Sequence, residues 1–379
     1  MNRTNNLVII GTSHHNTYGM IRCFGEYGVR PNLILYGNSH SYILRSALLG
    51  DKYIAKDAQE ALSLLKQNYD KAVVIACTDE IASLMDNQYD SIKEQFTFFN
   101  CGAEGQMTLY MDKVVQITIA KKCGIDVPYF IKGTVTNLST RDLHYPCIIR
   151  PLKSINGGKN IQICYDSSEL PKALESFDDS TEILAQEYIE KEYEIVLVGF
   201  SYGDTLEIPA YIRKIRDTKG GTTYSSVKSV ETLPAQLLAS CKDLVKKMNY
   251  TGLFGIELMR KGDKFYFVEI NLRNDATSFA VCMAGCNLPL AYWHLANGNQ
   301  TQLSPQNQIN QIHSMVEFND FIHVLKRQVS IRKWLKQRAD SECRYCYCKS
   351  DKRPYRIQCW DFVKFIVRMV YRHGLSKAN

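Results

Sequence analysis

Three polar side chains alternate with apolar ones at the end of a hydrophobic run. Glu269, Asn271 and Arg273 follow the apolar stretch 264–268. Because residues two apart on a β-strand share a face, the spacing predicts that a carboxylate, a carboxamide and a guanidinium project together. Oxygen ligands beside an arginine suit Mg²⁺ that holds nucleotide phosphates. The alternative is a surface strand with ordinary charges.

A second carboxylate, Glu257, lies twelve residues before Glu269, a spacing that a β-hairpin can span. Glu257 ends the strand-like run 252–256, and residues 260–264 are polar and contain Gly262, which predicts a turn. Two antiparallel strands joined there would bring Glu257, Glu269 and Asn271 to one place. We therefore expect these three residues to be the metal ligands.

The bulk composition is that of an ordinary globular protein. The chain has 379 residues, of which 45% are hydrophobic and 22% charged, enough for two or three domains at roughly 100–200 residues each. No run of 18 apolar residues occurs, and residues 1–6 lack the apolar core of a signal peptide. The 13 cysteines are odd in number and lie in core-like segments, which predicts reduced, buried thiols and a cytoplasmic location.

The net charge of +7 is unevenly distributed. Residues 326–379 hold 15 Lys and Arg against 4 Asp and Glu, which is +11, so the other 325 residues hold 31 against 35, which is −4. The basic excess therefore belongs to the C-terminal tail. We expect no nucleic-acid partner for the main body.

The first hundred residues alternate strands with helices. Apolar strand-like runs end near residues 13, 37 and 77, with a helical stretch at 18–27. This order predicts a doubly wound parallel sheet over residues 1–105. Ligands of such sheets bind beyond the carboxyl ends of the strands, which singles out 11–15 and 78–80.

Two later segments carry basic residues and glycines. Strand-like residues 146–151 and 161–164 flank a loop whose backbone N–H groups and ammonium charges could approach phosphates; its candidates are Lys153, Gly157, Gly158 and Lys159. An ordinary hairpin is the alternative. Residues 209–229 are polar and basic, which predicts a mobile loop. There Arg213 is our candidate for gripping a substrate carboxylate or γ-phosphate, the alternative being a solvated charge.

In this order the segments resemble an ATP-grasp enzyme with its preceding α/β domain, over roughly residues 5–300. The resemblance is most specific at Glu257 and Glu269-x-Asn271-x-Arg273. It implies that Glu257, Glu269 and Asn271 bind Mg²⁺ (or Mn²⁺), that ATP is the cofactor and that Arg273 is catalytic, facing the transferred phosphoryl group.

The resemblance also implies a nucleotide site. Lys113 and Arg150 match the two phosphate-contacting cations, and arginine at the second position is typical of the carbamoyl-phosphate synthase branch. Residues Gln186, Glu187, Tyr188 and Ile189 match the hinge that contacts adenine. Glu192 matches the ribose carboxylate, with Glu194 as the alternative on the same strand face.

The implied reaction phosphorylates a carboxylate and joins the acyl-phosphate to an amine, with release of ADP and phosphate. An amino acid or a surface-polymer precursor is the expected substrate. The alternatives are a catalytically inactive nucleotide-binding regulatory or scaffold protein and a carbamoyl-phosphate-type synthase. The implied fold is a pre-ATP-grasp α/β domain (1–105), a two-subdomain α+β ATP-grasp domain (106–185 and 186–300) and a basic helical extension (301–379).

The extension suggests two further possibilities. Cys343, Cys346, Cys348 and Cys359 could bind zinc, although their spacing departs from paired C-x-x-C. Residues 360–372 place Asp361, Lys364, Arg368 and Arg372 on one stripe of an otherwise apolar helix. Such a helix can lie on the inner face of an anionic membrane, dock on the protein's own core or contact a homodimer partner.

Overall fold

The N-terminal part is a doubly wound parallel sheet. The computed structural model describes residues 6–138, 143–152, 161–300 and 309–375. The strand order is β3-β2-β1-β4-β5, all parallel. The central strands are buried throughout, as expected for a sheet covered on both faces. The elements are β1 (Leu7–Gly11), α1 (His15–Gly25), β2 (Asn32–Tyr36), η1 (Tyr42–Arg45), β3 (Lys52–Ala55), α2 (Ala58–Asn68), β4 (Ala72–Ala76), α3 (Asp79–Asp86), α4 (Tyr89–Ile92) and β5 (Phe96–Thr97). The predicted sheet is confirmed.

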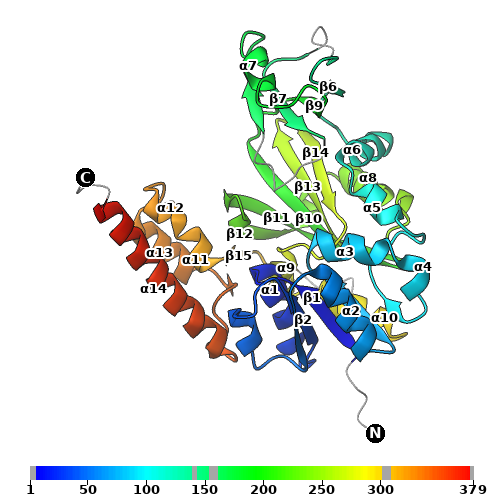
Figure 1. Ribbon diagram of the computed structural model, residues 1–379, viewed down its shortest axis with the longest axis vertical. Coiled ribbons are helices and arrows are strands. Elements are labelled where there is room, and N and C mark those ends of the chain that lie inside the picture. The colour runs from blue at the N-terminus through cyan, green and yellow to red at the C-terminus, as the bar shows by residue number, and fades with distance from the viewer. Residues whose placement is uncertain (1–5, 139–142, 153–160, 301–308, 376–379) are drawn as a thin grey trace.

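A small antiparallel sheet stands apart at one end of the molecule, at the top of Figure 1. Its strand order is β6-β9-β7-β8, and it packs on a core of its own that includes Cys147, Ile149 and Ile183. Helices α5 (Gln106–Tyr110) and α6 (Lys113–Lys122) precede it and pack into the main core. The elements of the small sheet region are β6 (Phe130–Thr134), β7 (Cys147–Pro151), β8 (Gln162–Cys164), α7 (Leu170–Leu174) and β9 (Glu182–Glu187). The chain then passes through residues 188–192 into the large sheet.

The large sheet lies between the small sheet and the N-terminal sheet (Figure 1). Its order is β14-β13-β10-β11-β12-β15-β16. The elements are β10 (Tyr193–Tyr202), β11 (Thr205–Thr218), β12 (Gly221–Ser229), η2 (Val230–Thr232), α8 (Ala235–Lys247), β13 (Gly252–Lys261), β14 (Lys264–Asn271), α9 (Ser278–Met283), α10 (Leu288–Ala296), β15 (Ile312–Met315) and β16 (Cys343–Arg344). Because β15 and β16 come from beyond residue 300, the C-terminal extension is part of this sheet.

The prediction of a mobile loop at 209–229 is wrong, because the segment forms most of strands β11 and β12. Ile208, Ala210 and Ile212 are buried at alternate positions, which is the period of a strand packed against a core. β11 pairs with β10 on one side and β12 on the other. The charged residues that suggested a loop are therefore held on a rigid sheet.

The C-terminal extension is mainly helical beyond its two strands, in line with the predicted fold class. Its helices are α11 (Glu317–Asp320), α12 (Ile322–Leu325), α13 (Ile331–Ala339) and α14 (Lys352–Leu375). Among the described residues, no helix is both long and apolar enough to cross a bilayer. All thirteen cysteines carry free thiols, and twelve are buried, as expected. No group of three or more His, Cys, Asp or Glu in the described residues is placed to hold a metal, the C-terminal cysteines included.

Buried carboxylates fasten the extension to the body. Asp320 is fully buried and pairs with Arg216 of β11, with 3.0 Å from Nε to Oδ1 and 2.7 Å from Nη2 to Oδ2. The same carboxylate accepts from Trp334 Nε1 at 3.0 Å. Asp351 accepts from the Ser46 hydroxyl, 2.5 Å away, next to η1. The extension is thus tied to both the large sheet and the N-terminal domain.

We expect Asp320→Asn to destabilise the fold by roughly 3–5 kcal/mol, because it leaves the Arg216 charge buried without a counter-charge. Urea unfolding followed by circular dichroism measures the effect. The matched control is Asp361→Asn, which removes an exposed carboxylate 3.6 Å from Lys364 and should change the free energy of unfolding by less than about 1 kcal/mol. Equal midpoints for the two variants would contradict the anchoring role.

Candidate active site

The hairpin β13–β14 brings the predicted metal ligands together. Glu257 lies opposite Glu269, and Gly255 lies opposite Asn271. Gly262 closes the turn at φ +58°, a backbone conformation that glycine adopts without strain. Asn271 Nδ2 approaches Glu257 Oε1 at 3.5 Å. The two carboxylates and the carboxamide therefore share one face of the sheet.

The surroundings shift the pKa values of the two carboxylates in opposite directions. Burial, together with the charge of Glu269, raises the pKa of Glu257 despite the nearby Lys214 ammonium. Burial also acts to raise the pKa of Glu269, but the charges of Lys113 and Arg273 outweigh it and hold that pKa below its usual value. Pairs of carboxylates held this close favour a divalent cation between them.

Two predicted cations approach the cluster from different elements. Lys113 is the first residue of α6, and its Nζ lies 3.2 Å from Glu269 Oε2. Arg150 extends from β7 of the small sheet and donates from Nη2 to Gln186 Oε1 at 3.1 Å. Its Nε is buried and has no hydrogen-bond partner among the described residues. The charge of Glu269 acts on this guanidinium, and an N–H with no partner in the described part of the chain is suited to a phosphate oxygen.

Arg273 is oriented by two partners. Its Nε lies 2.9 Å from Asp79 Oδ1, at the start of α3, and its Nη2 donates to Asn271 Oδ1 at 3.2 Å. Asp79 follows the carboxyl end of β4. The ion pair between Asp79 and Arg273 therefore connects segment 78–80 of the N-terminal domain to the end of β14 in the large sheet.

Lys214 also contacts the cluster, and the sequence analysis did not single it out as a site residue. Its Nζ lies 2.6 Å from Glu257 Oε2 and 3.0 Å from Glu194 Oε2. The side chain is only 13% exposed, and the two carboxylates raise its pKa against the opposing effect of burial. The strand period of Ile208, Ala210 and Ile212 would have placed residue 214 on this face if the segment had been read as a strand.

Arg213, our candidate for gripping the substrate, is not at the cluster. It precedes Lys214 on β11, so its side chain leaves the sheet from the other face. There its guanidinium carbon lies 4.2 Å from the centre of the Tyr193 ring. The expectation for Arg213 rested on a flexible loop, and the strand removes that freedom.

The structure also separates the two candidates for the ribose carboxylate. Glu192 accepts from the backbone N–H of Gly262 at 2.9 Å, in the β13–β14 turn. Glu194 lies farther along β10 and contacts Lys214 and Lys191. Glu194 is therefore the one of the pair that faces the metal-ligand cluster.

The hinge candidates join the small sheet to the large one. Gln186 and Glu187 end β9, and the N–H of Glu187 donates to Tyr129 O at 2.8 Å. The N–H of Tyr188 donates to Pro146 O at 2.9 Å, and Ile189 is buried. The hinge is thus held against the small sheet. Lys153, Gly157, Gly158 and Lys159 lie outside the described residues.

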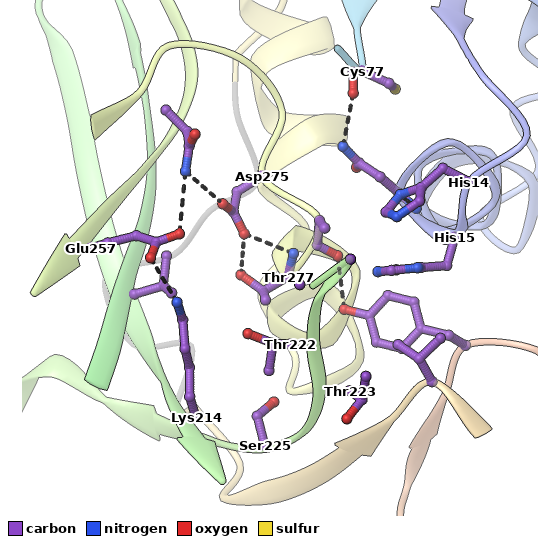
Figure 2. A pocket seen from close by; sticks show the side chains of 18 of the residues that line it. His14, His15, Cys77, Lys214, Thr222, Thr223, Ser225, Glu257, Asp275 and Thr277 are labelled. Carbon is purple, nitrogen blue, oxygen red and sulfur yellow. Dashed lines mark hydrogen bonds and ion pairs between the residues drawn. The ribbon is translucent and has the colours of Figure 1, made fainter. Parts of the chain in front are cut away.

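A polar cavity of about 310 Å³ extends from the cluster toward the N-terminal sheet. Figure 2 shows Glu257 and Lys214 on one side of it and His14 and His15 on the other. Asp275 lies between them and accepts from the backbone N–H of Thr277 at 2.8 Å. The cavity therefore opens directly beside the predicted metal ligands.

The imidazoles of His14 and His15 line the far wall of the cavity, and the pKa of each is lowered. Burial, and then the Arg273 charge, lower the pKa of His14, whose Nδ1 accepts from Asn16 N at 3.2 Å and caps α1. Burial lowers the pKa of His15 further. The His15 ring packs edge-on at 5.5 Å against Tyr345, a cavity residue contributed by the C-terminal extension. No local sequence signal indicated this tyrosine.

A second cavity, of about 460 Å³, lies on the Lys113 side. Its walls include Lys113, Gln116 and Leu152, and it shares Glu269, Asn271 and Arg273 with the first cavity. The motif found in the sequence thus forms a partition between two polar spaces. This arrangement lets one set of side chains contact two ligands.

The family model for the ATP-grasp domain matches residues 118–289. The chain carries an ATP-grasp domain. The match includes the hinge candidates, Glu257 and the whole of Glu269-x-Asn271-x-Arg273, and it confirms the resemblance seen in the sequence.

The relatives and structural neighbours of the chain are distant. It is 28% identical over 146 residues to formate-dependent phosphoribosylglycinamide formyltransferase of Wolinella succinogenes, a match covering 36% of each chain. An N5-carboxyaminoimidazole ribonucleotide synthetase in complex with ADP superposes with a TM-score of 0.65 at 12% identity, over 86% of this chain and 85% of that one. An L-amino acid ligase from Bacillus licheniformis gives 0.61 at 14%, over 83% and 81%. At these identities the structures show a shared fold, and the chain spans about a third of the curated relative's length.

Proposed function

We propose that this protein is an ATP-dependent ligase that activates a carboxylate as an acyl-phosphate and joins it to an amine. The observation that carries the proposal is that Glu269, Asn271 and Arg273 line both polar cavities and separate one from the other. A phosphoryl group held at this partition would be within reach of both a nucleotide and an acceptor. No protein nucleophile is needed for such a transfer.

The donor set at the cluster fits a hard divalent cation. Glu257, Glu269 and Asn271 offer oxygen ligands only, which suits Mg²⁺ or Mn²⁺. When bound there, the ion would neutralise charge on the ATP phosphates. Lys214 would hold the carboxylate of Glu257 in place through its 2.6 Å contact.

The residues around the cluster fit ATP. Lys113 and the Nε of Arg150, which has no partner among the residues that the structure describes, would contact the phosphates, and the hinge of Gln186 to Ile189 would contact adenine. Glu194 is our proposal for the ribose, since Glu192 is engaged with the hairpin turn. ADP bound to the synthetase neighbour supports a nucleotide at this kind of fold.

Arg273 is our proposed catalytic residue. Its guanidinium borders both cavities, and Asp79 and Asn271 fix its orientation. It would stabilise the acyl-phosphate and the tetrahedral species that follows. Electrostatic stabilisation of this type contributes about 3–4 kcal/mol per donor in other enzymes.

The 310 Å³ cavity is our proposed acceptor site. It holds Asp275 and the threonines 222, 223 and 277 near the imidazoles of His14 and His15 (Figure 2), so it can bind both an ammonium group and hydroxyl or carboxylate oxygens. This suits an amino acid or a surface-polymer precursor. The likeness to an L-amino acid ligase points in the same direction.

The test is ADP release in the presence of Mg-ATP and a panel of amino acids offered singly and in pairs. We expect turnover above the no-acceptor background with at least one pair, with phosphate formed in equal amount. Mg-ATP binding without turnover for any acceptor would favour the inactive scaffold. Turnover that requires bicarbonate and ammonia alone would favour the carbamoyl-phosphate-type synthase.

A further inference from the structure

Helix α14 presents apolar side chains to solvent on one face. Trp360 is 62% exposed, Val363 50% and Val367 61%. Their spacing of three and four residues places them on one side of the helix. Large side chains so exposed and so grouped favour a binding surface over an ordinary solvent-facing helix.

The opposite face of α14 is already covered by the protein. The Phe362 ring lies 5.1 Å from that of Phe318 and 5.2 Å from that of Phe321, both in the α11–α12 region. Tyr355 stacks on Phe318 at 5.8 Å. The helix therefore docks on its own core through the Phe362 side, and in Figure 1 it runs along the outside of the molecule. The Trp360 side is left largely exposed to solvent.

Basic residues lie on the same side as Trp360. Arg356 comes one helical turn before Trp360 and Lys364 one turn after it, and Arg353 lies two turns before. All three are exposed. The Lys364 ammonium lies 5.4 Å from the Trp360 ring and 3.6 Å from Asp361. We call Arg353, Arg356, Trp360, Val363, Lys364 and Val367 the Trp360 face.

The charge of this region selects one kind of partner. Residues 326–379 carry a net +11, so a second copy placed against the same face would bring two strongly positive surfaces together. An anionic surface instead attracts each lysine and arginine. The combination of an indole, two valines and flanking basic residues is the composition of a helix that lies in a lipid headgroup layer.

We propose that the Trp360 face binds the surface of an anionic lipid membrane. The apolar side chains reach the acyl boundary, and Arg353, Arg356 and Lys364 meet the lipid phosphates. The rest of α14 stays packed on the protein through Phe362, so the ATP-grasp domain is carried at the membrane surface. This inference does not depend on the proposed ligase activity.

The test is sedimentation of the full chain with phosphatidylcholine vesicles, with and without phosphatidylglycerol. We expect binding only when the anionic lipid is present, and release at about 0.5 M NaCl, where the screening length falls to a few ångströms. The chain has three tryptophans, so a blue shift of emission that Trp360→Phe abolishes reports the burial of Trp360 itself.

Matched variants separate the contributions. The triple change Arg353→Gln, Arg356→Gln, Lys364→Gln should lower the partition coefficient on the order of a hundredfold, from about fivefold per basic residue. Lys56→Gln, Lys71→Gln, Lys246→Gln removes the same charge from exposed positions on the body and should leave binding within about threefold. Equal losses in both variants, or no binding to anionic vesicles, would overturn the proposal. So would a dimer in light scattering without lipid that Trp360→Ser converts to a monomer.

Discussion

Replacing Glu269 by Gln is expected to lower the rate of ADP formation on the order of 10²–10³-fold. The change keeps the size of the side chain but removes a charged metal ligand and the partner of Lys113, 3.2 Å away. Loss of one electrostatic contact at a reacting phosphoryl group has this magnitude in other enzymes. Steady-state ADP release at saturating Mg-ATP, with any acceptor that supports turnover, measures it.

The control for this experiment is Glu94→Gln, an exposed glutamate on the N-terminal domain. It should retain the wild-type rate within about twofold, because exposed charges far from a site contribute little. Raising the Mg²⁺ concentration should recover part of the loss in Glu269→Gln and none in a variant that fails to fold. Undiminished turnover in Glu269→Gln would rule out the ligand role and, with it, the proposed use of the two cavities.

Lys214→Met should lower kcat/KM for ATP by roughly 10–100-fold, the range seen when a group that orients a metal ligand is removed. Lys214 bridges Glu257 and Glu194 with contacts of 2.6 and 3.0 Å. Without it, Glu257 and Glu194 would repel each other across the place where phosphates and metal are expected. Lys214→Arg keeps the charge and should recover a measurable part of the rate.

Arg213→Met is the matched control for Lys214→Met. The two residues are neighbours on β11, but Arg213 stacks on Tyr193 on the opposite face of the sheet. We expect its turnover to stay within about twofold of wild type. If Arg213→Met lowers turnover more than Lys214→Met does, the Lys214 face of β11 is not the one that matters for turnover. The interpretation of Arg213 as a substrate contact would then regain support.

The hairpin could be predicted from the sequence because every signal for it is local. Alternating residues on β14, the glycine turn and Glu257 all lie within seventeen residues of one another, 257 to 273. Strand period and turn chemistry act over that range. The phosphate cations Lys113 and Arg150 needed the family resemblance, because they come from different elements and no spacing connects them.

The part of the site that could not be predicted depends on long-range pairing. Lys214 was hidden because glycines and charges dominate the composition of 209–229, and because its partner Glu257 lies 43 residues farther along the chain. Tyr345 reaches the cavity because β16 pairs with β15 and β15 with β12. Such contacts are set by tertiary packing, which local propensity does not report.

The pairing of β12 with β15 also bears on where the chain can be cut. Residues 224–227 of β12 bond to residues 312–315, so a polypeptide ending at residue 300 would present that row of backbone N–H and C=O groups to solvent. An open edge beside the buried Val227 is a template for pairing with other chains. The boundary at residue 300 suggested by sequence is therefore a poor end for a shortened protein, which would be prone to self-association through the exposed edge of its large sheet.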